Sequence, residues 1–206
     1  MMLEKMNEKG LLDKIGYLFE KNKISNLKKI FVKINLSTKE FRDIWSSWWE
    51  EEIPPRQEID LILVFTNDIE KVRIVGVEVK YFKEKGKSPY LGLDQVLSFS
   101  LFGFDSLILW HIFSPNLKNT LVENYKKPVM ELINGLNLPI TYIATKIFED
   151  NTFELFAPHS ISFRYKVDSF LIYLEKSTKE KRNPLFYKEE VKRRRKVLKI
   201  ILKIPW

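Results

Sequence analysis

The spacing of apolar and polar positions predicts a chain that alternates between helices and strands. Apolar residues at helical intervals predict helices over residues 11–22, 91–102, 116–134 and 188–204. Runs rich in β-branched and aliphatic residues predict strands over residues 29–36, 58–65, 72–82, 106–113, 140–148 and 152–156. Residues 161–173 also have the composition of a strand. A capping box at Ser37 and Glu40 predicts one more helix, which ends before Pro54.

These elements predict an α/β protein with a mixed sheet flanked by helices. The strands at 58–65 and 72–82 are separated by a short polar turn, which favours a hairpin. The strand at 106–113 is almost wholly apolar, which indicates burial on both faces. We expect one domain over residues 1–178 and a basic C-terminal extension over residues 179–206.

Charge is unevenly distributed along the 206 residues, whose formal net charge is +8. Residues 179–206 hold eleven Lys and Arg against three acids, so the rest of the chain is neutral. A basic tail of this kind favours a polyanionic partner. The excess of Lys over Arg, with many Ile residues, fits a thermophile or an AT-rich genome.

Several classes of protein are excluded by composition. The chain has no Cys, which excludes disulfide scaffolds, thiol catalysis and Cys-ligated metal centres. It has only two His, His111 and His159, which we expect in the core and in a turn respectively. Neither a signal-peptide core nor a membrane-spanning run is present, so we expect a soluble intracellular protein without a membrane partner.

The hairpin register brings three ionisable side chains together. With the turn centred near Ile69, Asp60 lies opposite Glu78, and directly opposed side chains lie roughly 4.5–5.5 Å apart at Cβ. Lys80 lies two residues after Glu78 and therefore shares its face of the strand. Burying such charges costs several kcal/mol each, so a purely structural role is an uneconomical explanation. The alternative is a ladder of opposite charges on a half-exposed hairpin.

Paired carboxylates suit a hard cation such as Mg²⁺ or Mn²⁺. We expect Asp60 and Glu78 to bind the metal, with help from the backbone carbonyl of Val79. A metal there acidifies a bound water and neutralises charge on a scissile phosphate. Lys80 would orient or deprotonate that water, or balance charge at the phosphorus.

Asp60, the triplet Glu78-Val79-Lys80 after an aliphatic strand, and a following helix that carries Gln95 resemble the PD-(D/E)xK nuclease superfamily. The resemblance covers residues 8–113 and implies a restriction-endonuclease-like αβββαβ core, with residues 114–178 as an αβ extension. Archaeal and viral nucleases and Holliday junction resolvases share that fold. By resemblance, Asp60 and Glu78 are metal ligands, Lys80 is the catalytic lysine, and Gln95 supports the site.

The family often has a further acid on its first helix, and the sequence leaves this position open. The candidates there are Glu8, Asp13 and Glu20, and Glu58 and the run Glu50, Glu51 and Glu52 are alternatives. The resemblance implies hydrolysis of DNA phosphodiester bonds and allows a homodimer, since cutting both strands of a duplex needs two sites.

Two basic segments are candidates for DNA binding. Lys83, Lys85 and Lys87 follow the candidate site directly, and Arg193, Arg194, Arg195 and Lys196 form a dense run in the last helix. That helix also has an apolar face at Val197, Leu198, Ile201 and Leu202, which is consistent with docking on the domain or with binding at a membrane surface. Trp45, Trp48 and Trp49 have the spacing of a helix face packed on a core, or would stack on bases.

The sequence therefore predicts a Mg²⁺-dependent deoxyribonuclease. The main alternative is a non-catalytic protein that binds nucleic acid or supports an assembly and keeps the nuclease fold, since fold does not imply function. A peripheral membrane protein that uses its last helix is a third hypothesis.

Overall fold

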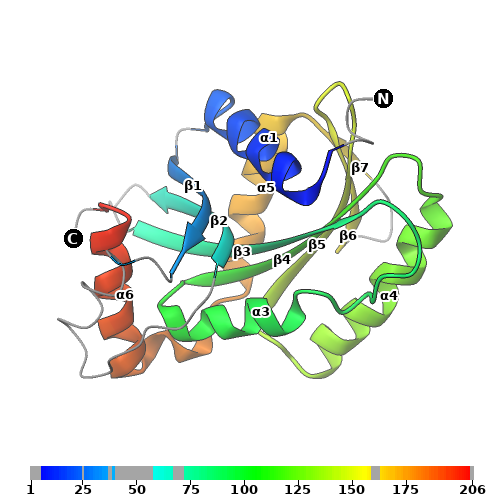
Figure 1. The fold of residues 1–206 in the computed structure, drawn as a ribbon. Helices are drawn as coiled ribbons and strands as arrows, with labels where there is room; N and C mark the ends of the chain where they lie inside the picture. The colour runs from blue at the N-terminus through cyan, green and yellow to red at the C-terminus, as the bar shows by residue number, and fades with distance from the viewer. Residues whose placement is uncertain are drawn as a thin grey trace.

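A computed structural model describes residues 6–24, 26–36, 39, 58–66, 72–158 and 163–204. These residues form an α/β fold with one mixed sheet between two layers of helices (Figure 1). The helix expected over residues 40–53, the three tryptophans, the run Glu50–Glu52 and His159 lie outside the described residues.

Within the described ranges the sheet has seven strands in sequence order. They are β1 (Leu27–Asn35), β2 (Glu58–Thr66), β3 (Val72–Phe82), β4 (Ser106–Phe113), β5 (Ile140–Ile147), β6 (Phe153–Ala157) and β7 (Phe163–Tyr165). The first three strands are antiparallel to one another, β3, β4 and β5 are parallel, and β6 and β7 return to antiparallel pairing. The strand expected at 106–113 is confirmed, and every residue in it is buried.

Helices cover both faces of the sheet. Their bounds are α1 (Glu8–Lys21), α3 (Leu93–Ser98), α4 (Asn119–Gly135), α5 (Val167–Glu180) and α6 (Glu189–Ile201), with 3₁₀ turns η1 (Phe99–Phe102) and η2 (Pro184–Tyr187). The α1 and α5 helices pack on one face, where Phe19 stacks on Trp110 with ring centroids 6.0 Å apart. The α3, α4 and α6 helices and η1 pack on the other.

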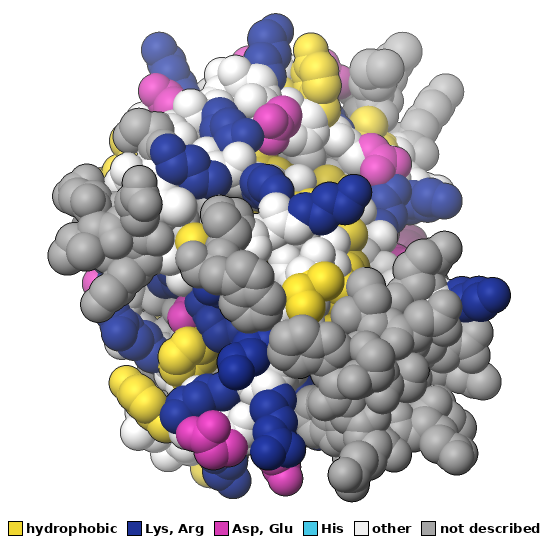
Figure 2. All heavy atoms as spheres, turned by 90° about the vertical axis from the view of Figure 1, so that its left-hand side faces the viewer, with side chains coloured by type: hydrophobic (Ala, Val, Ile, Leu, Met, Phe, Trp, Pro, Cys, Tyr) yellow, Lys and Arg dark blue, Asp and Glu magenta, His cyan; other side chains and the backbone are white. Residues whose placement is uncertain are grey.

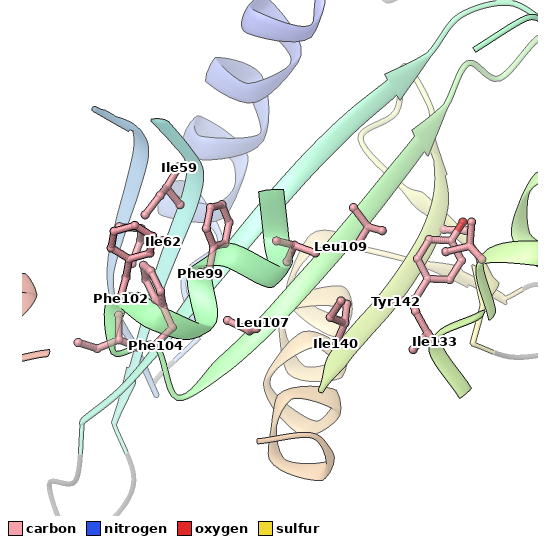
Figure 3. Close-up of a cluster of buried hydrophobic side chains, with 14 of the residues drawn as sticks. Ile59, Ile62, Phe99, Phe102, Phe104, Leu107, Leu109, Ile133, Ile140 and Tyr142 are labelled. Atoms are coloured by element: carbon pink, nitrogen blue, oxygen red, sulfur yellow. The ribbon is translucent and has the colours of Figure 1, made fainter. Parts of the chain in front are cut away.

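The apolar layer on the face covered by α3, α4, α6 and η1 fixes the position of β2 and β3. Phe99 and Phe102 of η1 lie against Ile59 and Ile62 of β2 (Figure 3). Gly103 ends this segment with a positive φ of 84°, directly after the helix predicted over residues 91–102. All four of these apolar side chains are buried, so the sheet is rigidly held close to Asp60.

One expected element is wrong. Residues 161–173 have strand composition, but the described part of this range, residues 163–173, contains the short strand β7 followed by the beginning of α5. The buried residues Val167, Phe170, Leu171 and Leu174 recur at helical intervals and pack against the α1 face of the core. This tertiary burial outweighs the weak β preference of the aromatic and branched residues.

The last helix docks its apolar face on the protein. Val197, Leu198 and Leu202 are buried in the same core layer as η1. Figure 1 shows α6 at the end of the sheet where β3 begins, and Figure 2 shows Lys and Arg side chains spread over this side of the molecule. The docked arrangement is therefore the one observed, and its apolar face is covered by the domain.

Arg195 departs from its expected role as a nucleic-acid contact. Its Nη1 lies 2.7 Å from Asp105 Oδ2 and donates to Gly103 O, while Nη2 donates to Val72 O. Asp105 in turn accepts a hydrogen bond from Ile74 N. The Arg195 side chain is buried, and its contacts connect α6 to the start of β3. Its guanidinium therefore binds groups of the protein itself.

We expect Arg195→Ala to lower the free energy of unfolding by about 3–5 kcal/mol, because it leaves the Asp105 carboxylate, whose side chain is only 19% exposed, without its cation. Arg193→Ala, at an exposed position on the same helix, should change it by less than about 0.5 kcal/mol. Urea unfolding followed by tryptophan fluorescence measures both. Equal small losses in the two variants would show that the ion pair does not anchor α6.

Candidate active site

The candidate site forms where β2 separates from β3. Their ladder has the predicted register, with Ile62 opposite Gly76 and Val64 opposite Ile74. The ladder ends at Leu61 and Val77, although β2 continues to pair with β1. Past this point the Asp60 side chain takes the place of a strand partner.

Two backbone N–H groups of β3 are bound by carboxylates at this separation. Val79 N donates to Asp60 Oδ2 over 2.8 Å, and Tyr81 N donates to Glu8 Oε2 over 2.8 Å. Glu8 is the first residue of α1, whose N-cap is Asn7. The beginning of α1 is thereby brought beside the end of β3.

The structure selects among the acids of the first helix. Asp13 forms an ion pair with Lys33, and Glu20 forms one with Lys23. Glu8 is the one whose charge acts on Asp60 and Glu78. The helix predicted over residues 11–22 begins after Glu8, so the sequence did not show that this acid lies in the first turn of α1 or that it reaches Tyr81 N.

Glu78 and Lys80 lie on the same face of β3, as the alternation of a strand requires. Lys80 Nζ is 2.5 Å from Glu78 Oε1. Glu78 is only 1% exposed, and its second oxygen, Oε2, is buried without a hydrogen-bond partner among the described residues. The carboxylate is therefore half-satisfied, which is a costly state for a buried acid.

Burial and mutual repulsion perturb the acids. Loss of hydration raises the pKa of Glu78 to about 8, and the nearby Asp60 charge adds to the rise. Burial likewise raises the pKa of Asp60 to about 6, against the hydrogen bond from Val79. Burial opposes the charge of Lys80, but its pKa is raised overall because of the bond to Glu78. Lys80 is thus a cation at neutral pH.

A glycine closes the site from the side of α3. Gly92 has φ +81°, and a Cβ there would lie 3.0 Å from both Glu78 Cγ and Lys80 Cε. Any side chain would press on the two residues and strain the backbone. Gly92 is not among the residues predicted from the sequence, although a glycine between the ExK strand and the next helix is a usable signal.

His111 holds the turn at residues 89–92 in place. It is fully buried and accepts a hydrogen bond at Nδ1 from the Tyr142 hydroxyl, 3.1 Å away, while Nε2 lies 3.0 Å from the Leu91 carbonyl. A carbonyl only accepts, so the proton is on Nε2. Burial lowers the pKa of His111 to about 4. The expected core histidine is confirmed, and it fixes the residue before Gly92.

The other predicted residues lie at varying distances from the acids. Gln95 is half-buried on α3, three residues after Gly92. Lys83, Lys85 and Lys87 are exposed on the adjoining loop, and Lys87 Nζ donates to Tyr81 O. On α6, Arg193 and Lys196 are exposed, and Arg194 donates to Leu101 O. Arg195 of the same helix binds Val72 at the start of β3, about 20 Å along the strand from Glu78.

The donor set fits a Mg²⁺-like cation. In the described ranges no three His, Cys, Asp or Glu side chains are grouped closely enough to enclose a metal ion. Mg²⁺ commonly uses only one or two carboxylates and keeps several waters. The unpartnered Glu78 Oε2 and the repulsion between Asp60 and Glu78 are both relieved by a cation between them.

A scan of protein-family models and searches of curated proteins and of solved structures found no match to this chain. None of the helices in the described ranges is both long enough and apolar enough to cross a membrane. Function is therefore inferred from the geometry and chemistry of the acid cluster.

We expect the free energy of unfolding, measured in EDTA, to fall as pH rises from about 5 to about 8. Over this interval folded Glu78 retains a proton that the unfolded chain, with its ordinary pKa of 4.5, has lost. The stabilisation is complete below the unfolded pKa and disappears as pH passes the folded one. In Glu78→Gln, the loss in free energy of unfolding between pH 5 and pH 8 should be smaller by on the order of 3 kcal/mol.

Urea unfolding at both ends of the pH range measures the effect. Glu131→Gln, at an exposed position on α4, is the control and should keep the wild-type pH dependence. Parallel pH dependences in wild type and Glu78→Gln would show that Glu78 has an ordinary pKa.

Proposed function

We propose that this protein is a metal-dependent nuclease of the PD-(D/E)xK type that hydrolyses DNA phosphodiester bonds. The observation that carries the proposal is the convergence of Asp60, Glu78 and Lys80 where β2 separates from β3. The succession α1, β1 to β3, α3 and β4 supports a restriction-endonuclease-like core, since it has the order αβββαβ, with an additional expected helix between β1 and β2.

Asp60 and Glu78 would hold Mg²⁺ or Mn²⁺, with the Val79 carbonyl as a further oxygen donor. When bound, the metal supplies positive charge at the scissile phosphate and lowers the pKa of a coordinated water. The two acids come from different strands, and both strands are fixed by buried residues on either side. They are therefore preorganised for a ligand of one size.

Lys80 would position the attacking water and stabilise negative charge on phosphate oxygens. Its raised pKa keeps it protonated at neutral pH, so it acts as a donor of hydrogen bonds rather than as a base. Gln95, on the helix that follows Gly92, would support the site from the α3 side. Glu8 would keep Tyr81 and the end of β3 in place through its hydrogen bond.

DNA would reach the acids along the loop of Lys83, Lys85 and Lys87. These exposed cations adjoin Tyr81, whose carbonyl accepts from Lys87. Contacts between lysines and phosphates release counterions, so the affinity should fall as salt rises. Cleavage of both strands of a duplex would use a symmetric pair of subunits.

Cleavage of labelled duplex, single-stranded, flap and junction DNAs in Mg²⁺ or Mn²⁺ tests the proposal. Asp60→Ala and Glu78→Ala should reduce cleavage to background, and Lys80→Ala should reduce the rate by about 10²–10³-fold, because it removes one charged donor. Glu131→Ala and Lys127→Ala, exposed on α4, remove the same charges elsewhere and should cleave as wild type does.

Cleavage that survives Glu78→Ala would overturn the assignment of the site. Absence of cleavage from every substrate, with salt-sensitive DNA binding unchanged in all variants, would favour the non-catalytic alternative. Binding to DNA in EDTA therefore has to be measured beside cleavage.

The role of Glu8 has its own test. Glu8→Ala should lower the cleavage rate about 10–100-fold, because it removes the acceptor that holds Tyr81, the residue after Lys80, and loss of such a supporting partner of a site typically has a cost of this size. Glu20→Ala, two turns or more further along α1 and paired with Lys23, should leave the rate unchanged. Equal rates for the two variants would show that Glu8 serves the fold alone.

A further inference from the structure

A cleft lies at the opposite end of β3 from the acids, between the ends of α5 and α6. It encloses about 690 Å³, a volume typical of small-molecule sites. Its cations are Arg73, Lys179, Arg182, Arg195 and Lys199. Arg73 lies about 16 Å along the strand from Glu78 and, by alternation, on the opposite face, so the cleft is separate from the candidate active site.

Positive charge exceeds negative charge in this cleft. Its two acids are Asp105 and Glu175, and both are used internally. Asp105 pairs with Arg195, and Glu175 is shared by Lys179 at 2.9 Å and Arg73 at 3.7 Å. Within the described residues, no acid lies within ion-pair distance of Arg182 or Lys199.

The cations also affect one another. Burial lowers the pKa of Arg73 against the attraction of Glu175, and the charge of Arg182 lowers it further. Burial lowers the pKa of Lys199 too, with Arg195 adding to the shift. Arg73 Nε is buried and lacks a hydrogen-bond partner among the described residues. A bound anion would relieve both the repulsion and the unsatisfied donor.

Aromatic rings accompany the cations. The Arg73 guanidinium lies 5.4 Å from the centroid of Phe65, and that of Arg195 lies 4.8 Å from Phe186. Tyr187, which also lines the cleft, is 75% exposed. An exposed ring beside unpaired cations suits a ligand that combines a flat base with a phosphate.

We propose that this cleft binds the phosphate of a nucleotide, in a nucleic-acid strand or free, through Arg182 and Lys199, with Tyr187 stacking on the base. The proposal goes beyond the nuclease assignment and does not depend on it, because neither Asp60 nor Glu78 takes part. A strand held here would add a contact far from the acids.

The test is binding in EDTA, where no cleavage takes place. A labelled oligothymidylate is titrated with wild type, with the double variant Arg182→Ala/Lys199→Ala, and with the control Lys118→Ala/Lys127→Ala, which removes two exposed lysines near α4. We expect Arg182→Ala/Lys199→Ala to bind at least about tenfold more weakly than wild type. The slope of log affinity against log salt concentration should correspond to about one to two fewer released counterions. The control should lose less than about threefold.

A second arm identifies the source of the phosphate. Thymidine monophosphate and inorganic phosphate are titrated by calorimetry into the same proteins. Saturable binding of the mononucleotide that the cleft variant loses assigns the site to a free nucleotide. Loss confined to the oligothymidylate assigns it to a strand. Equal binding of all probes by the cleft variant and the control overturns the proposal.

Folding and stacking are checked independently. Removing repelling cations should leave the melting temperature of the ligand-free cleft variant at or above that of wild type. If the double variant melts early, Arg182→Ala alone, at an exposed position, replaces it in both arms. Tyr187→Ala should weaken binding and Tyr187→Phe should restore it, whereas equal binding by these two variants contradicts stacking.

Discussion

The arrangement of the candidate site depends on one event in the sheet, the separation of β2 from β3 after Leu61 and Val77. A backbone N–H group in a protein interior needs an acceptor, and beyond this point β2 no longer supplies one to Val79 and Tyr81. Carboxylates of Asp60 and Glu8 supply them. The same backbone constraint therefore gathers negative charge beside Glu78.

The charge cluster is maintained by the apolar layers around it. β4, which pairs with β3, and β5, which pairs with β4, are buried along their full length, and helices pack on both faces of the sheet. His111 and Gly92 fix the turn that covers Glu78 and Lys80. The surrounding layers keep water away from the acids, so burial raises the pKa of both Glu78 and Asp60, and the charge of Asp60 adds to the rise at Glu78. Such perturbed groups are typical of functional sites.

The sequence predicted the sheet well because the strands are governed by local pattern. β3 and β4 have the expected bounds, and the register of the hairpin followed from the position of its turn. The strand composition of residues 161–173 did not predict α5, because its aromatic and branched residues favour a strand locally. Their helical spacing matters only when they pack against α1.

The parts of the site that depend on contacts between residues far apart in the chain could not be predicted from the sequence. Asp60, Glu78 and Lys80 follow from alternation on two adjacent strands. The selection of Glu8 over Asp13 and Glu20 depends on where α1 meets the end of β3, 73 residues later in the chain. The burial of Arg195 depends in the same way on Asp105, which no local pattern in α6 reveals.

The central claim is that Asp60 and Glu78 form a binding site for a divalent cation, and direct measurement of Mn²⁺ binding by electron paramagnetic resonance tests it. The account predicts that wild type binds Mn²⁺ saturably, that Mg²⁺ competes, and that Asp60→Ala and Glu78→Ala each abolish the bound signal while Glu131→Ala retains it. Binding of Mn²⁺ by all four proteins with the same affinity, or by none of them, would contradict the account.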